Sequence, residues 1–410
     1  MSQPRLGAWS PLRHLDFALL WGAALVSNSG SWMHDLAAGW LMTTVDPSPA
    51  MVSLVSAATT LPVCLLALPA GTLADAVDKR RLLMAVQFAM LLAAALLGVA
   101  VLGGWAGNST LLAVTFALGT GTAIMSPTWQ AIIPLLVPRA ELHQAVALHA
   151  VGINIARAIG PAIGGLVIVS LGIAWPFLIN SLSFLAVVGA LCWWRMPPQP
   201  AHARPKEGFL AAMRTGLGQV QENTGLRHAL WRSVLFFGFA SAYWALLPLI
   251  ARAQLRGGAN LFGFLVACIG VGAVTGATLL PRYRRRWGLD RVTTVGTVGT
   301  ALAMAGFALS HAPALGLIAA TLAGASWVAS LSSLNVAAQL SLPDWIRARG
   351  MGLYTSVFYG CLALGSVMWG QVATRLGIAP TLAIAAMGAL IGLIPAARLS
   401  LQPPTVVAPN

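Results

Sequence analysis

Long apolar segments recur along almost the whole of this 410-residue sequence, and they constrain the fold more than any other feature. Each holds about 20 predominantly apolar residues, the length that a helix needs to cross the hydrocarbon core of a bilayer. Charged residues make up only 8% of the chain, against about 25% in soluble domains. Because a bilayer offers no water to unpaired backbone groups, each segment is predicted to be a helix.

Twelve spans are predicted, in an all-α membrane protein. Their ranges are 17–42, 51–73, 82–102, 111–137, 145–170, 173–194, 230–250, 261–280, 292–309, 315–340, 351–373 and 378–397. The net charge of +14 sets their orientation, because cationic residues collect in cytoplasmic loops. With the N-terminus inside, only Arg252, Arg256 and Arg375 lie outside, and Arg157 lies within a span. We therefore expect a multi-pass protein of the bacterial inner membrane with both termini cytoplasmic. The basic loops then face anionic lipid headgroups, and no nucleic-acid partner is expected.

The chain divides into two similar halves around a Pro-rich segment that begins at Met196 and cannot continue a helix. Similar short sequences recur at one constant spacing in the two halves: 171–174 with 376–379, Gly160 and Gly165 with Gly365 and Gly370, Pro138 with Pro343, and 79–81 with 284–286. The predicted domains are an N-terminal six-helix bundle at 1–195, a cytoplasmic linker with an amphipathic helix at 196–228, and a C-terminal six-helix bundle at 229–410. Such a parallel repeat suits alternating access between two bundles.

The loop after the second predicted span carries one glycine, two aspartates and a basic pair: Gly71, Asp75, Asp78, Lys79 and Arg80. It resembles the signature loop between helices two and three of the major facilitator superfamily, although Ala76 replaces the usual Arg and Asp78 the usual Gly. The resemblance implies the major facilitator fold and a gating latch in which Asp75 meets the N-terminus of helix eleven. An anion at such a terminus gains about 0.3–1 kcal/mol. The alternative is that the two aspartates only balance the neighbouring basic residues.

The fifth span contains a second motif, formed by Gly160, Pro161, Gly164 and Gly165. It resembles the motif of drug:proton antiporters in the same superfamily, which implies export. The first span and the signature loop together resemble the exporter branch that contains the enterobactin exporter and the transmembrane secretion effectors. The resemblance covers essentially the whole chain. Close packing of helix backbones is a sufficient structural explanation of the glycines.

Asp35 and Arg157 are the ionisable acid and base groups that lie well inside predicted spans, where burial is costly and such groups are functional hypotheses. We expect Asp35 to take up a proton from the periplasmic side and Arg157 or His34 to sense its neutralisation. Asp35 lies about 27 Å along its span at a rise of about 1.5 Å per residue, in the outer half. Two structural alternatives stay open: Asp35 lies at a wet cavity mouth, or Arg157 is a hydrogen-bonding hub near Pro161.

The walls of a substrate cavity are expected to combine apolar surface with sparse polar groups, which suits an amphipathic or aromatic substrate. The candidate residues are Trp32, Trp129, Gln130, Asn180, Tyr243, Trp244, Asn335, Gln339, Tyr354, Phe358 and Tyr359. For each aromatic residue the structural alternative is a position facing lipid.

The sequence favours a secondary active transporter that exports drugs, metabolites or siderophores in exchange for protons. The two lysines do not follow the glycine spacing of a phosphate-binding loop, which disfavours an ATP-driven pump. Neither a metal cluster nor a nucleophile motif is present in the sequence, so we expect no cofactor, no metal and no enzyme activity. A monomer is expected, with a small molecule, protons and lipids as partners. Uptake of a metabolite, a non-transporting receptor and a membrane enzyme are the alternatives.

Overall fold

The computed structural model describes residues 7–195, 223–343 and 347–401, apart from the side chains at 68, 72, 75, 76 and 348. The first part contains η1 (Ser10–Arg13), α1 (Leu15–Val45), α2 (Pro49–Ala76), α3 (Lys79–Leu102), α4 (Asn108–Leu136), η2 (Arg139–Glu141), α5 (Leu142–Leu171) and α6 (Trp175–Trp193). The rest contains α8 (Thr224–Leu249), the π-helical turn η3 (Ile250–Gln254), α9 (Ala259–Leu309), α10 (Pro313–Leu340), α11 (Arg347–Leu376), α12 (Ile378–Ile391) and α13 (Leu393–Ala396).

The helices correspond to the predicted spans. Ten helices among the described residues are long and apolar enough to cross a membrane. The helix α1 is absent from that set because its middle is polar, around Asn28. The helix α9 holds two predicted spans, since Gly288 has φ 73° and ψ 174° and breaks its regular geometry. Counting α1 and both parts of α9, and taking α12 with α13 as one span, recovers twelve spans and confirms the predicted all-α membrane fold.

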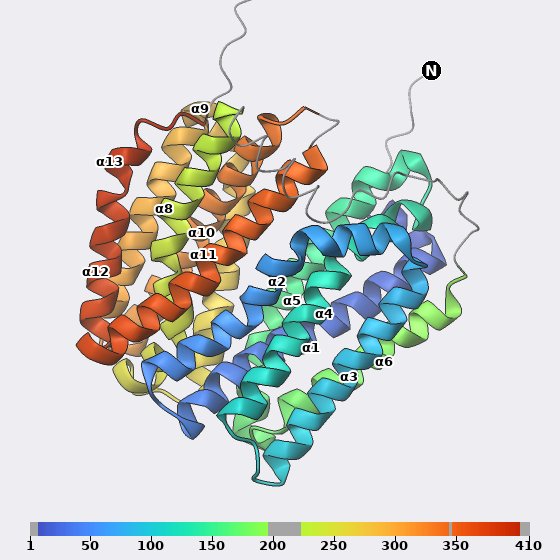
Figure 1. Ribbon diagram of the computed structural model, residues 1–410, viewed down its shortest axis with the longest axis horizontal. Coiled ribbons are helices and arrows are strands. Elements are labelled where there is room, and N and C mark those ends of the chain that lie inside the picture. The colour runs from blue at the N-terminus through green and yellow to red at the C-terminus, as the bar shows by residue number, and fades with distance from the viewer. Residues whose placement is uncertain (1–6, 196–222, 344–346, 402–410) are drawn as a thin grey trace, which may run out of the picture.

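Figure 1 shows two groups of helices, one coloured blue to green and the other yellow to red. In the first group, which we call the N bundle (α1–α6), α1 packs against α5 and α6, and α3 packs against α4 and α6. In the second, the C bundle (α8–α13), α9 packs against α10 and α12, and α8 against α11. The two bundles meet mainly through α2 with α11 and α5 with α9. The predicted amphipathic linker helix lies outside the described residues, and α8 begins at Thr224, inside the predicted linker range.

Equivalent glycines of the two halves occupy equivalent places. Gly172 and Gly377, with φ of 107° and 85°, end α5 and α11 in a conformation that L side chains rarely adopt. Gly165 faces the backbone of Ala259 in the C bundle, and Gly370 faces Ser53 in the N bundle. The internal repeat seen in the sequence is therefore also a repeat of contacts.

The buried apolar side chains form two clusters. The larger joins both bundles and takes from the N bundle only residues such as Leu41, Val55 and Leu111, from one end of its helices. The smaller belongs to the N bundle alone and contains Phe17 and Trp194, from the opposite end. We call the end where α1 ends and α2 begins the far end, and the end where α1 begins the near end. The N bundle thus shares its apolar core with the C bundle only at the far end.

Candidate functional site

The glycine-proline motif of α5 brings three helices together. Cβ atoms added at Gly160 and Gly164 would lie 2.6 Å from the Ser29 carbonyl oxygen and 2.8 Å from the Met33 Cγ, both in α1. A Cβ at Gly165 would lie 2.8 Å from the Ala259 carbonyl oxygen at the start of α9. The motif therefore allows α5 to pack tightly on α1 within its bundle and on α9 across the bundle interface.

Arg157 lies near the middle of α5, one helical turn before this motif, and is half-buried. Its guanidinium carbon lies 5.1 Å from the ring centre of Trp32 in α1, within the range of a cation–π interaction. Tyr243 of α8 and Tyr359 of α11 lie in its vicinity. The predicted candidates Arg157, Trp32, Tyr243 and Tyr359 are thus brought together from both bundles.

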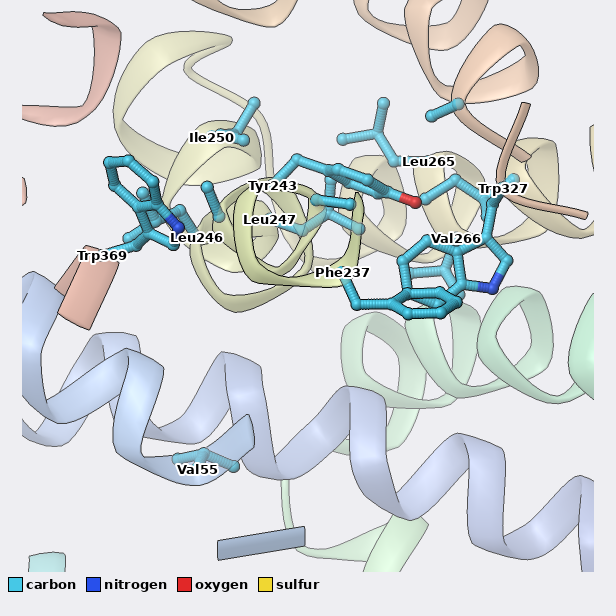
Figure 2. Packing of buried hydrophobic residues seen from close by; sticks show 14 of the residues in the cluster. Val55, Phe237, Tyr243, Leu246, Leu247, Ile250, Leu265, Val266, Trp327 and Trp369 are labelled. Carbon is cyan, nitrogen blue, oxygen red and sulfur yellow. The ribbon is translucent and has the colours of Figure 1, made fainter. Parts of the chain in front are cut away.

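An aromatic cluster of the C bundle extends from these tyrosines. Trp244 lies 5.6 Å from Tyr243 and 5.8 Å from Trp327, measured between ring centroids. Phe358 lies 4.8 Å from Tyr359 and 6.3 Å from Trp327. Figure 2 shows Tyr243 and Phe237 of α8 beside Trp327 of α10. Trp327 was not singled out from the sequence, because nothing in its apolar segment distinguishes it from a lipid-facing residue.

The Asp35 side chain has an accessible surface although its neighbours His34 and Leu36 are buried. The ion pairs between described residues, His14–Glu141 and Arg232–Asp290, do not include it. His34 faces α6, with its ring 4.8 Å from that of Phe177, and neither of its buried nitrogens has a hydrogen-bond partner in the described chain. Asp35 and Arg157 thus form no direct pair, and His34 points away from both toward α6.

The remaining cavity candidates are dispersed. Trp129 and Asn180 lie in the N bundle core, where Trp129 stacks on His149 and Asn180 bonds with Ser183. Tyr354 is 2% exposed and packs in the C bundle. Gln130 is exposed, and Gln339 donates a 2.6 Å hydrogen bond to Asn335 one turn earlier in α10. Hydropathy could not distinguish cavity positions from positions inside a bundle, because a polar side chain in a span can face a cavity or another helix.

The signature loop has two residues with clear structural roles. Asp78 caps α3, since its carboxylate accepts a 2.8 Å hydrogen bond from the Arg81 backbone N–H. Arg80 donates to the carbonyls of Leu191 and Cys192 at the end of α6, at 2.6 and 3.1 Å. Gly71 has open space at its Cβ position. Lys79 begins α3, and Asp75 lies in the last turn of α2, with its side chain outside the described residues.

Arg252 forms a clamp between the bundles that was not singled out from the sequence. Its Nη1 donates to the carbonyl and hydroxyl oxygens of Thr43, at 2.6 and 2.9 Å, and its guanidinium lies 5.7 Å from the Trp40 ring. The π-helical turn η3 carries it, and the Gln254 amide of that turn bonds to the Phe307 and Ala308 carbonyls. The available signal was the rarity of basic residues on the predicted outer side.

Other contacts between the bundles also lie at the far end. The Ala50 N–H donates to the Thr374 hydroxyl at 3.1 Å, and a Cβ at Gly39 would lie 3.2 Å from Pro248. In the adjacent loop, hydrogen bonds from Ser48 hold the pKa of Asp46 below its usual value. These contacts close the far end of the interface, and the separate core of the N bundle lies at the near end.

Comparisons with known proteins identify the family and the fold. The profile of the transmembrane secretion effector family matches residues 6–407. The staphyloferrin A transporter of Staphylococcus aureus is 24% identical and aligns over 87% of this chain and 89% of its own length. The enterobactin exporter EntS of Shigella boydii is 26% identical, with 82% of each chain covered.

Solved transporter structures share the fold. The nucleoside transporter NupG, as its D323A mutant, superposes with a TM-score of 0.78 at 13% identity, covering 94% of this chain and 99% of its own. A bacterial homologue of the lysosomal transporter Spinster, in an inward-facing conformation, gives a TM-score of 0.69 at 15% identity, covering 95% and 96%.

The predicted class is therefore confirmed: a multi-pass membrane transporter of small molecules, and not an enzyme. With a family match over nearly its full length and a fold shared with solved transporters, this chain belongs to the transmembrane secretion effector family of the major facilitator superfamily.

Proposed function

We propose that this transporter exports amphipathic small molecules across the bacterial inner membrane in exchange for protons. Export is supported by the function of relatives such as the enterobactin exporter and by the glycine-proline motif of α5. The far end would face the periplasm and the near end the cytoplasm, with both termini cytoplasmic, as the distribution of Lys and Arg favours. The monomer would work alone, with lipid headgroups around its basic loops.

The main support for proton coupling is that Asp35 has no charged partner among the described residues. A carboxylate in a membrane-spanning helix is costly unless it is paired or faces water. Asp35 is exposed on α1 between buried neighbours, and no cation pairs with it among the described residues. A carboxylate in such a place can exchange protons with solvent and change charge as the bundles rearrange. If Asp35 instead lies at a water-filled mouth of the cavity, its carboxylate can stay charged throughout transport.

The N bundle would carry the coupling and gating groups, and the C bundle would complete the cavity with its aromatic cluster. The division at 195 and 229 follows the predicted linker. Asp75 would latch the near end in the opposite conformation, while Asp78 and Arg80 hold the loop by capping α3 and α6. This assignment gives each bundle one task in alternating access.

Everted membrane vesicles test the function directly. We expect them to accumulate dyes, drugs or siderophores from a panel when energised, and to release them when a protonophore collapses the gradient. Asp35→Asn should reduce this accumulation to the level of vesicles without the protein, because the variant side chain cannot exchange a proton.

Asp16→Asn is the matched control, since Asp16 lies in the first turn of the same helix and is exposed. It should transport like the unchanged protein. Full gradient-driven accumulation by Asp35→Asn would refute the proton role, and turnover of a substrate without its movement would indicate an enzyme.

A further inference from the structure

Among the described residues, Arg157 is a cation without a counter-charge. It takes part in neither ion pair of the described chain, and its Nε is buried with no hydrogen-bond partner there. Removing a guanidinium from water is unfavourable when nothing compensates its charge, and a buried donor without an acceptor adds to that cost. The Trp32 ring offsets only part of this. The described surroundings of Arg157 therefore lack an anionic partner.

The neighbours of Arg157 supply further donors and few acceptors. The Tyr243 hydroxyl and the Trp244 Nε1 are buried close to each other, and neither has another hydrogen-bond partner among the described residues. An indole N–H can only donate, and a guanidinium has no acceptor. Since Arg157 lies near Tyr243, and Tyr243 lies against Trp244, donors from two bundles are close together. Their common partner would have to bring acceptor oxygens of its own.

The surrounding surface is aromatic. Trp32 lies over the guanidinium, while Tyr359, Phe358 and Trp327 form a chain of ring contacts on the side of the C bundle. Flat rings of this kind bind flat apolar bodies by stacked or edge-to-face contacts. A strongly hydrated, multiply charged ion would gain little from them, and one cation balances one negative charge.

We propose that Arg157 binds the single anionic group of a planar aromatic substrate, a carboxylate or a group of the same shape, whose rings lie against the aromatic cluster. This rests on the transport function proposed above and names the substrate class for it. The Arg157 guanidinium donates two parallel hydrogen bonds to two oxygens of the anion. The Tyr243 hydroxyl and the Trp244 N–H donate further hydrogen bonds. Because Arg157 belongs to α5 and the tyrosines to α8 and α11, the bound anion joins the two bundles.

A matched pair of probes tests the charge requirement: 2-naphthoate and 2-naphthamide, which share the ring system and differ in charge. Calorimetric titration of the purified full-length protein in nanodiscs, with empty nanodiscs as a blank, gives both affinities. We expect naphthoate to bind at least about ten-fold more tightly, which corresponds to about 1.4 kcal/mol. Equal affinities, or no binding of either probe, would overturn the proposal.

Substitution assigns the preference to one residue. Arg157→Gln should bind both probes alike, and Arg157→Lys should retain a reduced preference, because lysine keeps the charge without the planar fork. Arg375→Gln removes an exposed arginine from the last turn of α11 and should change nothing. A preserved preference for naphthoate in Arg157→Gln would contradict the role of Arg157. If Arg157→Gln aggregates on size exclusion, Arg157→Lys is measured in its place, and an unchanged affinity of Arg157→Lys for naphthoate would contradict that role.

This experiment needs no gradient, so it is independent of the proton test. An Asp35→Asn variant that loses driven accumulation but keeps the naphthoate preference supports both proposals. If Asp35→Asn keeps driven accumulation, the proton role of Asp35 is refuted. If the protein shows no preference for naphthoate over naphthamide, the anion-binding role of Arg157 is refuted.

Discussion

Arg252 connects the far ends of the two bundles directly. Thr43 lies in the last turn of α1, where the carbonyls have no partner within the helix, and Arg252 supplies both a donor and a positive charge to that negative helix end. Arg252 is exposed, so solvent screening limits its contribution to about 1 kcal/mol. A contact of this size can bias the far end toward the closed state and would still break if the bundles rearrange during transport.

Removing the clamp should shift this balance. Arg252→Gln is expected to raise the ratio of far-end-open to far-end-closed molecules about five-fold, the factor that 1 kcal/mol gives. Spin labels at the exposed positions Thr44 and Asn260, one in each bundle, report the change as a larger fraction of long distances. Arg256→Gln removes the same charge a few residues away and should leave the distribution unchanged. An identical effect of both variants would mean that net charge, and not the clamp, decides.

At the scale of elements, the close packing of α5 on α9 depends on missing side chains. A Cβ at Gly165 would lie 2.8 Å from a carbonyl oxygen and 3.2 Å from the Cα of Asn260, and a backbone cannot swing aside as a flexible side chain can. Gly263 faces the same contact from α9, where an added Cβ would lie 2.7 Å from the Pro161 carbonyl oxygen. The antiporter-type motif is therefore part of the bundle interface at the far end.

Gly165→Ala should destabilise the closed far end by about 1–3 kcal/mol, the usual cost of overpacking, and slow transport accordingly. The spin-label distances and the uptake rate in vesicles measure the two effects. Gly189→Ala is the control, because Gly189 has nothing within 4 Å of its Cβ position. Alanine there should be neutral or slightly stabilising in the helix. Normal transport by Gly165→Ala would show that the motif has no gating role.

At the scale of the whole molecule, transport by alternating access requires α2 and α11 to move relative to each other. Two native thiols lie on either side of this contact, Cys64 of α2 and Cys361 of α11, and the Cys64 sulfur would be 3.2 Å from a Cβ at Gly360, the residue before Cys361. They form a native reporter of the bundle interface.

A short bifunctional thiol reagent should link Cys64 to Cys361 and stop transport, in a protein whose Cys192 and Cys268 are replaced by serine. Mass spectrometry of the linked peptides identifies the bridge, and cleavage of a reducible linker should restore transport. Cys361→Ser should be insensitive to the reagent. Equal inhibition by a monofunctional reagent would show that bulk at Cys64 or Cys361, and not the bridge, blocks the cycle.

The number of spans, the all-α fold and the two similar halves could be predicted from the sequence, because each depends on local composition and on repeats along the chain. The packing role of Gly160 and Gly164 was also foreseeable, since small residues at this spacing allow helices to approach. The roles of Asp78 and Arg80 as caps of α3 and α6 could not be foreseen. A carboxylate beside basic residues has the same local sequence pattern whether it caps a helix or forms a gating contact.

The sequence alone determined what crosses the membrane: long apolar helices, their division into two halves, and the rarity of charges within them. Only the tertiary structure decided which side chains meet: Arg157 lies near Trp32 and two tyrosines of the other bundle, Trp129 lies inside the N bundle, and Arg252 reaches across the far end. It also leaves Asp35 without a partner among the described residues. The physical reason is that hydropathy depends on which residues a segment contains, whereas contacts depend on the rotation and tilt of each helix. Those are set by packing between segments more than 100 residues apart, such as Arg252 and Thr43.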